Sequence, residues 1–338
     1  MIRRILIISI IVLPLNDVTA QTQIAPESTT TENNSIAFKG DGLRIDQKAF
    51  LSQHDVVFLS PAVEGYEDFP IGNGDLGAMA WTPPDKLFFQ INKTNTWDDA
   101  EPGIFSPWEG KENPEKAEQF TSLRHCGQLT IEPGLPVFDW IYLNDFEGRL
   151  SLSDAETSWN ASGLNGKVRC RSFVATEPSV MVVRYEDNLR EPVDRRIILA
   201  RWGSRVFEHW YRYVRRDFLL GNQGTKAGCD GNEVWIEQPT RSLKFAIAAK
   251  LIGPDVDAQR MNSREAGYVI NTGKRCAFDI YLSVVTSEEA DDPLAKASQN
   301  VRKAAKAGTE KVFTAHKKRW AVFWSKSFIY LPDDYLEN

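Results

Sequence analysis

Short apolar or alternating segments recur between residue 36 and about residue 286, and Gly, Asn, Asp or Pro residues separate them. Many short strands with regular turns between them are typical of an antiparallel sandwich. The alternation of strands and helices that accompanies a parallel sheet does not occur in this pattern. We therefore expect a mainly β protein with one large antiparallel sandwich over residues 36–286. The segments with the clearest strand pattern are 55–59, 77–81, 86–91, 148–152, 168–175, 180–185, 196–201, 233–237, 243–251, 268–271 and 277–286.

The hydrophobic period changes to that of a helix after residue 287. Asp292 is suited to cap a helix that starts at Pro293, and Gly308 is suited to end it. A second helix is expected to begin after Thr309, and one of its sides is wide and aromatic. That side must pack either on the sandwich or on a following domain. Its residues are Val312, Phe313, Trp320, Phe323 and Trp324.

The N-terminal segment has the three parts of a secretory signal peptide. Residues 1–4 include two arginines, residues 5–15 are mostly apolar, and residues 18–20 form a cleavage site of small residues. We expect cleavage near Ala20, a flexible polar leader over 21–35, and a mature protein that is secreted or periplasmic with no membrane segment. An uncleaved N-terminal membrane anchor is the alternative interpretation.

Net charge and composition indicate which kinds of partner molecule the protein binds. The net charge is −6, from 40 Lys and Arg residues against 46 Asp and Glu residues, and no long basic segment occurs. A nucleic-acid partner is therefore not expected. The 10 Trp, 9 Tyr and 18 Phe residues are of the kind that stacks on sugar rings, although a large hydrophobic core also needs aromatic residues.

Four cysteines are spread widely along the chain. Their spacing contains no C-x-x-C pair, so we expect no metal site. An oxidising compartment permits disulfides, but a chain of this length buries a core without them, so free thiols and disulfides both stay open. The four residues are Cys126, Cys170, Cys229 and Cys276.

The clearest local motif is F-P-I-G-N-G-D-L-G-A-M at residues 69–79. Gly72, Asn73 and Gly74 adopt positive φ at low cost, so the motif predicts a tight turn between two strands. Its G-x-G lacks the third Gly and the following helix of a dinucleotide site. The sequence contains no P-loop, G-x-S-x-G or H-E-x-x-H motif, so we expect no cofactor and assign no catalytic residue.

A second motif, N-K-T-N-T-W-D-D at residues 92–99, follows an apolar strand. Amides and carboxylates at a strand end hydrogen-bond sugar hydroxyls, and an indole covers the apolar face of a sugar ring. The alternative is that these side chains satisfy the backbone of their own loop through Asx-turns. The candidate sugar-binding residues are Asn92, Asn95, Thr96, Trp97 and Asp98.

Together, the 69–79 motif and Q-I-N-K-T-N-T-W at residues 90–97 resemble the N-terminal domain of glycoside hydrolase family 95. The resemblance implies a β-supersandwich, a helical linker over 287–330 and a catalytic (α/α)6 barrel. Residues 331–338 would begin that barrel, and the rest of it would be missing from this chain. Family members are inverting α-L-fucosidases or α-L-galactosidases whose reacting acids lie in the barrel, so the resemblance transfers no catalytic residue to this chain.

The sequence departs from the family pattern at three places. Asp75 stands where many members have Arg, Lys93 stands where an acid is common, and W-D-D at residues 97–99 replaces W-S-G. These differences are compatible with a divergent subfamily, for which the resemblance does not define the sugar.

We therefore expect the non-catalytic domain of a secreted glycoside hydrolase, which braces the barrel and shapes substrate access. Carbohydrate is the expected ligand, and the chain's own missing barrel is the expected partner. A stand-alone carbohydrate-binding module and a structural domain that docks a partner chain are the alternatives. Exposure of the Trp320 and Trp324 side would favour a missing domain, whereas packing of that side on the sheet would favour a stand-alone module.

Overall fold

The structure of the 338-residue chain is a computed structural model. It describes residues 36–39, 42–67, 69–102, 119–202, 205–211, 214–220, 224–240, 242–256 and 258–326. The expected signal peptide, the leader over 21–35 and the segment 331–338 lie outside the described residues. The chain divides into two units, Met1–Asp46 and Gln47–Asn338. The described part of the first unit is an antiparallel hairpin of β1 (Ile36–Lys39) and β2 (Gly42–Ile45).

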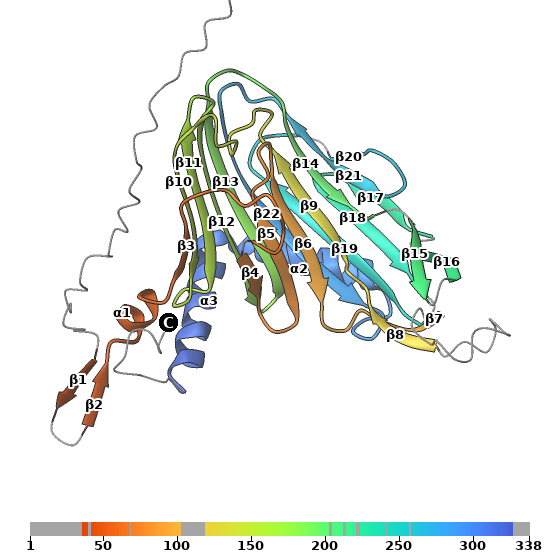
Figure 1. The fold of residues 1–338 in the computed structure, drawn as a ribbon, viewed down its shortest axis with the longest axis horizontal. Helices are drawn as coiled ribbons and strands as arrows, with labels where there is room; N and C mark the ends of the chain where they lie inside the picture. Colours follow the sequence, from red (N-terminus) through yellow and green to blue (C-terminus); the bar gives the residue numbers. More distant parts are fainter. Residues whose placement is uncertain are drawn as a thin grey trace, which may run out of the picture. The chain divides into compact units, whose positions relative to one another are not determined.

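The second unit is dominated by two large antiparallel sheets (Figure 1). The nine-stranded sheet has the order β17 (Lys226–Asp230), β18 (Glu233–Pro239), β19 (Lys244–Ile252), β22 (Arg275–Thr286), β13 (Ser179–Leu189), β12 (Gly166–Thr176), β11 (Glu156–Gly163), β10 (Leu143–Ser151) and β3 (Val56–Phe58). The seven-stranded sheet has the order β20 (Gln259–Arg260), β21 (Glu265–Ile270), β14 (Arg195–Ala200), β9 (Gly127–Glu132), β6 (Leu87–Lys93), β5 (Leu76–Trp81) and β4 (Phe69–Gly72). The prediction of a mainly β fold with a large antiparallel sandwich is confirmed.

The main hydrophobic core lies between the two sheets, and strand alternation explains why. Along β6, Leu87, Phe89 and Ile91 are fully buried, while the residues between them are half-buried on the other face. Successive side chains of a strand point to opposite faces, so the apolar set of β6 enters the core together. Trp159 on β11 meets this set from the opposite sheet, with its ring centroid 5.9 Å from that of Phe89. Aromatic contacts of this kind therefore join the two sheets.

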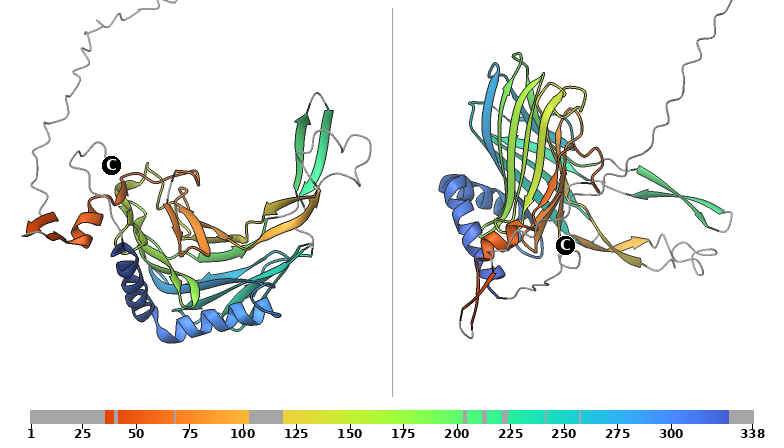
Figure 2. Two further views of the ribbon diagram at one scale, coloured as in Figure 1. Left: turned by 90° about the horizontal axis from the view of Figure 1, so that it is seen from below. Right: turned by 60° about the vertical axis from the view of Figure 1, so that its left-hand side comes forward.

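A C-terminal pair of helices covers the outer face of the nine-stranded sheet (Figure 2). The first, α2 (Pro293–Ala307), begins where the Asp292 side chain accepts the Ala295 N–H at 3.0 Å, and it ends at Gly308. Its buried Ala297, Val301 and Ala304 form a second core with residues of β13, β19 and β22. The predicted helical segment after the sandwich is confirmed. Within the described residues, no helix is both long enough and apolar enough to cross a bilayer.

The second helix, α3 (Thr309–Trp324), follows directly, and only its first half is buried. Val312 and Phe313 are each 7% exposed, and the Phe313 ring lies 5.0 Å from that of Phe173 on β12. Val322 and Phe323, near the other end, are each 54% exposed. The sequence pattern placed Phe313 and Phe323 on one wide side, and the sheet covers only the earlier part of it.

The remaining elements are short. The helix α1 (Gln47–Ser52) precedes β3. Two separate antiparallel ribbons extend beyond the sheets (Figure 2). One pairs β7 (Trp97–Pro102) with β8 (Gln119–Leu123), and the other pairs β15 (Arg205–Tyr211) with β16 (Val214–Leu220).

All four cysteines are free thiols in the structure. Cys126, Cys170 and Cys276 are buried, and Cys229 is exposed. Burial disfavours the thiolate and raises the pKa of Cys126 to about 12. The core therefore carries these sulfur atoms as small apolar groups, and disulfides make no contribution to this arrangement.

Alanine substitutions at neighbouring positions of β6 should show, by their effect on stability, which side chains point into the core. Phe89→Ala should lower the free energy of unfolding by about 3–5 kcal/mol, because it opens a cavity between the sheets. Phe88→Ala, at the adjacent outward position, should cost about 1 kcal/mol, because that ring is half-buried and its main ring contact is with Trp81. Urea unfolding of both variants measures the difference, and equal losses would contradict the assigned register.

Candidate functional site

The β4–β5 hairpin turns at Gly72, Asn73 and Gly74. The Asn73 Oδ1 atom accepts the backbone N–H groups of Asp75 and Leu76, both at 2.9 Å, and Gly74 adopts φ of 92°. A carboxamide that caps its own turn and a glycine at positive φ are the usual chemistry of a tight connection. The Asn73 side chain therefore stabilises the turn from within.

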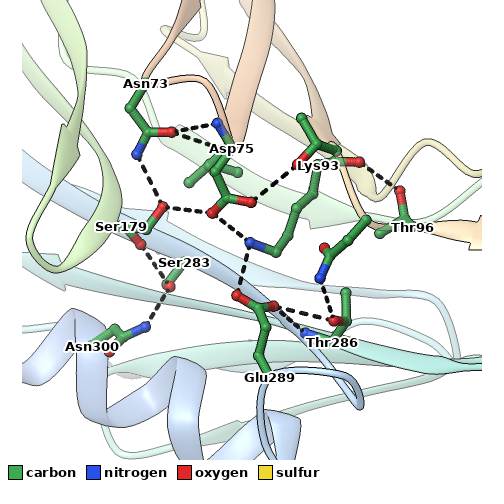
Figure 3. Close-up of polar contacts among 12 residues, drawn as sticks. Asn73, Asp75, Lys93, Thr96, Ser179, Ser283, Thr286, Glu289 and Asn300 are labelled. Carbon is green, nitrogen blue, oxygen red and sulfur yellow. Dashed lines mark hydrogen bonds and ion pairs between the residues drawn. The ribbon is translucent and has the colours of Figure 1, made fainter.

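The same side chain also reaches the opposite sheet (Figure 3). Its Nδ2 group donates to the Ala175 carbonyl at 2.8 Å and to Ser179 Oγ at 3.0 Å, at the turn between β12 and β13. One amide thus fixes a turn of the seven-stranded sheet against a turn of the nine-stranded sheet.

A buried ammonium group strengthens this junction. The Lys93 side chain is completely buried at the end of β6, and its Nζ atom lies 2.6 Å from Asp75 Oδ2 and 3.1 Å from Glu289 Oε1. Glu289 precedes α2 and also accepts the Thr286 N–H at 2.8 Å. Asn73, Asp75, Lys93, Ser179 and Glu289 are called the inter-sheet network below (Figure 3).

Two carboxylates share one buried ammonium in this network. The Asp75 and Glu289 side chains remain 41% and 37% exposed, so water solvates part of each carboxylate while both contact the ammonium. Further hydroxyl donors reach Asp75 from Thr94 and Ser179, each at 3.3 Å. The arrangement therefore holds the two sheets and the segment before α2 together.

Asp75 and Lys93, two of the positions singled out in the sequence, are therefore in direct contact with each other.

Two of the candidate sugar-binding residues contact the chain itself. Asn95 Nδ2 donates to Thr286 Oγ1 at 2.8 Å, and Thr96 Oγ1 lies 2.6 Å from the Arg124 carbonyl. Thr96 is fully buried. The Asn95 Oδ1 atom is buried, and it has no hydrogen-bond partner among the described residues.

The other three candidates lie elsewhere. Asn92 is half-buried on the outer face of the seven-stranded sheet, and Trp97 at the start of β7 is 48% exposed. Asp98 lies in β7, but its side chain is outside the described residues. Among the four candidates whose side chains are described, Asn95 and Thr96 bond to the chain itself, and the sugar-binding role of all five stays a prediction.

Sequence reasoning missed a group of side chains beside Asn92. Gln90 lies two residues earlier on β6 and is the direct cross-strand partner of Gln128 on β9. The Trp202 Nε1–H group donates to Gln128 Oε1, and the Trp202 ring lies 4.2 Å from that of His125. Gln90, Asn92, Gln128 and Trp202 are called the amide patch below. The polar positions of β6 could have revealed half of it, but the pairing of β6 with β9 is non-local.

A groove of about 780 Å³ lies between α3 and the turns of the two hairpins. Its α3 wall includes Val312, His316, Trp320 and Phe323, and Asn73 and Ala175 are among the turn residues that line it. At the end of the helix, Trp324 Nε1 donates to the Leu152 carbonyl at 2.9 Å, which fixes this indole against the β10 side. Trp320 and Trp324 are both half-buried. This side of α3 is therefore neither fully exposed, as a missing domain would favour, nor fully packed on the sheet, as a stand-alone module would favour.

His316 is a buried titratable group in the wall of this groove. It is 3% exposed, its Nε2 atom lies 3.1 Å from the Ala155 carbonyl, and its ring lies 4.9 Å from that of Phe173. Burial disfavours the charged imidazolium and lowers the pKa of His316 below its ordinary value. Among the described residues, no cluster of His, Cys, Asp and Glu side chains is arranged to hold a metal ion.

Comparison with known proteins shows similarity of fold without similarity of sequence. Neither a protein family model nor a curated protein sequence matches the chain. Among solved structures, a putative kojibiose phosphorylase from the human microbiome matches with a TM-score of 0.50 and 11% sequence identity, over 80% of this chain and 38% of that chain. The chain thus spans less than half of that protein, with which it shares a fold.

Two further structures match at lower scores. A bacterial glucoamylase, solved in complex with acarbose, matches with a TM-score of 0.34 and 9% identity, over 78% of this chain and 40% of that chain. A family GH92 α-mannosidase from Bacteroides thetaiotaomicron matches with a TM-score of 0.23 and 11% identity, over 80% of this chain and 34% of that chain. Similarity at these scores does not define a shared fold.

Removing the buried ammonium should weaken the junction of the sheets. Lys93→Met should lower the free energy of unfolding by about 1–3 kcal/mol, because Asp75 and Glu289 lose their common cation. Lys86→Met is the matched control, since Lys86 only approaches the exposed Asp85 at 3.5 Å and its loss should change stability by less than about 0.5 kcal/mol. Chemical unfolding of both variants compares the two lysines, and a Lys93 variant as stable as the control would refute the role given to the network.

His316 should make the protein less stable in mild acid. Its pKa is lower in the folded state than the ordinary value of about 6.5, so the unfolded chain binds the proton more readily and stability falls as the pH drops below about 6.5. His316→Phe should flatten the stability profile between about pH 7 and pH 5 relative to the unsubstituted protein. Phe138→Leu, a packing control whose buried ring contacts Phe146, should lower stability by a similar amount at every pH. Parallel profiles for the His316 variant and the unsubstituted protein would contradict this assignment.

Proposed function

We propose that this chain is the non-catalytic β-sandwich domain of a secreted glycoside hydrolase, where it braces a catalytic (α/α)6 barrel and shapes substrate access. The family 95 motifs at residues 69–79 and 90–97 support the proposal. The fold similarity to a protein described as a kojibiose phosphorylase, of which this chain covers 38%, supports it as well. The substrates that the sequence resemblance implies for the whole enzyme are α-L-fucosides or α-L-galactosides.

The observation that carries the proposal is the groove beside α3. Val322 and Phe323 line it and are each 54% exposed, and contiguous apolar surface of this kind marks an interaction site. Lys318, Arg319 and Lys326 also line the groove, whereas Glu177 is the one acid among its described lining residues. The covering surface of the barrel should therefore be apolar with acidic residues at its rim.

The buried half of α3 favours one alternative, a stand-alone module that binds carbohydrate or a partner chain. Val312 and Phe313 are covered by the chain's own sheet, and this half of the helix needs no other domain to bury it. Such a module would leave the exposed half of α3 in water or use it to dock a different protein.

The reading frame after Asn338 tests the proposal directly. We expect it to continue into a mainly helical segment of about 400 residues that carries acidic side chains in its centre. A stop codon at that point in the intact gene would overturn the barrel partner and leave the stand-alone module.

The purified chain should be inactive as a hydrolase. We expect no turnover of aryl α-L-fucosides or α-L-galactosides, because the resemblance places the reacting acids in the proposed barrel and not in this chain. Turnover that is abolished by Asp75→Asn or Glu289→Gln, with the fold retained by circular dichroism, would place catalysis in this chain and contradict the proposal.

An acidic side chain placed in the groove should destabilise the longer gene product but have little effect on the stability of the isolated chain. Phe323→Asp should destabilise the barrel contact by at least about 2 kcal/mol in the longer protein, whereas the isolated chain should lose little because this side chain is already 54% exposed. Leu164→Asp is the control, since Leu164 is 59% exposed and lies in the β11–β12 turn. Thermal unfolding of the four proteins measures the effect, and an identical response to both substitutions would contradict docking at the groove.

A further inference from the structure

The outer face of the seven-stranded sheet carries a row of neutral polar side chains. Gln90 and Asn92 alternate with the buried Phe89 and Ile91 on β6, so both amides point away from the core. Gln128 extends the row across the strand pair, because it is the direct partner of Gln90. The two helices lie on the far side of the sandwich, against the nine-stranded sheet (Figure 2).

These amides keep unused hydrogen-bonding capacity. Neither Gln90 nor Asn92 makes a side-chain hydrogen bond within the described part of the chain, although both are half-buried. Each carboxamide offers two donors and one acceptor oxygen. Strand backbone holds them at a fixed spacing, so a ligand that pairs with them meets a largely preformed arrangement.

The surroundings of the row differ along β5. Asn92 faces Gly77, which in turn faces Gly72 on β4, so the sheet beside Asn92 is bare backbone, whereas Gln90 faces the half-buried Met79. On the β9 side, a hydrogen bond to Gln128 holds the half-buried Trp202 indole next to that amide. None of the four side chains of the amide patch carries a charge.

We propose that the amide patch binds a neutral glycan. Gln90, Asn92 and Gln128 hydrogen-bond the hydroxyl groups, and the Trp202 indole covers the apolar side of a pyranose ring. The inference rests on the proposed function in that it takes carbohydrate as the ligand class. It differs in placing the binding residues on the sheet face, with Asn92 as the one member shared with the loop of residues 92–98.

The chemistry favours a neutral glycan over other ligands. Phosphate, sulfate or uronate groups are usually bound by Arg or Lys, and the patch supplies neither. Hydroxyl groups that both donate and accept match carboxamides, which also do both. Half-buried Met79 lies directly across from Gln90 on this face, so the apolar contact beside the amides is small and suits one face of a sugar ring.

The experiment uses the purified chain on an array of immobilised neutral oligosaccharides with terminal fucose, galactose, glucose, mannose or xylose. The array's best binder is then titrated by calorimetry. Gln90→Ala and Asn92→Ala should each weaken its binding about 3- to 10-fold, the loss expected for one neutral hydrogen bond. Asn160→Ala is the matched control, because Asn160 is a half-buried amide on β11 of the other sheet, and its variant should bind unchanged.

The possible outcomes separate clearly. Binding that both β6 variants weaken and the Asn160 variant retains, with unchanged circular dichroism, supports the proposal. Absence of binding across the array, or binding that the β6 variants leave unchanged, overturns it. A stop codon after Asn338 would remove the barrel partner without affecting these titrations, so the two proposals fail independently.

Discussion

One buried ammonium group holds together the parts of this molecule that matter for its function. Lys93 sits at the end of β6 with no exposed side-chain surface, and its two carboxylate partners come from the β4–β5 turn and from the segment before α2. An ammonium without partners in that position would be costly, so the turn and the helix segment must both stay close to it. This requirement places the two helices, and hence the groove beside α3, relative to the hairpins of both sheets.

The same strand also separates the two surfaces that we consider functional. Lys93 points inward to the network, and its neighbour Asn92 points outward to the amide patch, because successive side chains of a strand alternate. The patch lies on the outer face of the seven-stranded sheet, and the groove lies beside a helix that packs on the nine-stranded sheet. The polar face that we propose for a glycan and the groove that we propose for a barrel therefore lie on different sides of one sandwich.

The sequence by itself determined the local structure. Alternation in segments such as 86–91 and 180–185 predicted strands, and the Asp292–Pro293 and Gly308 residues marked the limits of α2, because strand period and helix caps depend on near neighbours. Only the tertiary structure decided which distant residues meet: that β6 pairs with β9 within one sheet, that Lys93 contacts Glu289, and that the nine-stranded sheet covers the first half of α3. These contacts join residues far apart in the chain, and no local pattern encodes which distant strand or side chain will complete a site. For the same reason, Asn92 and Thr96 looked like members of one cluster in the sequence, yet Asn92 lies on the outer face of the sheet and Thr96 is buried.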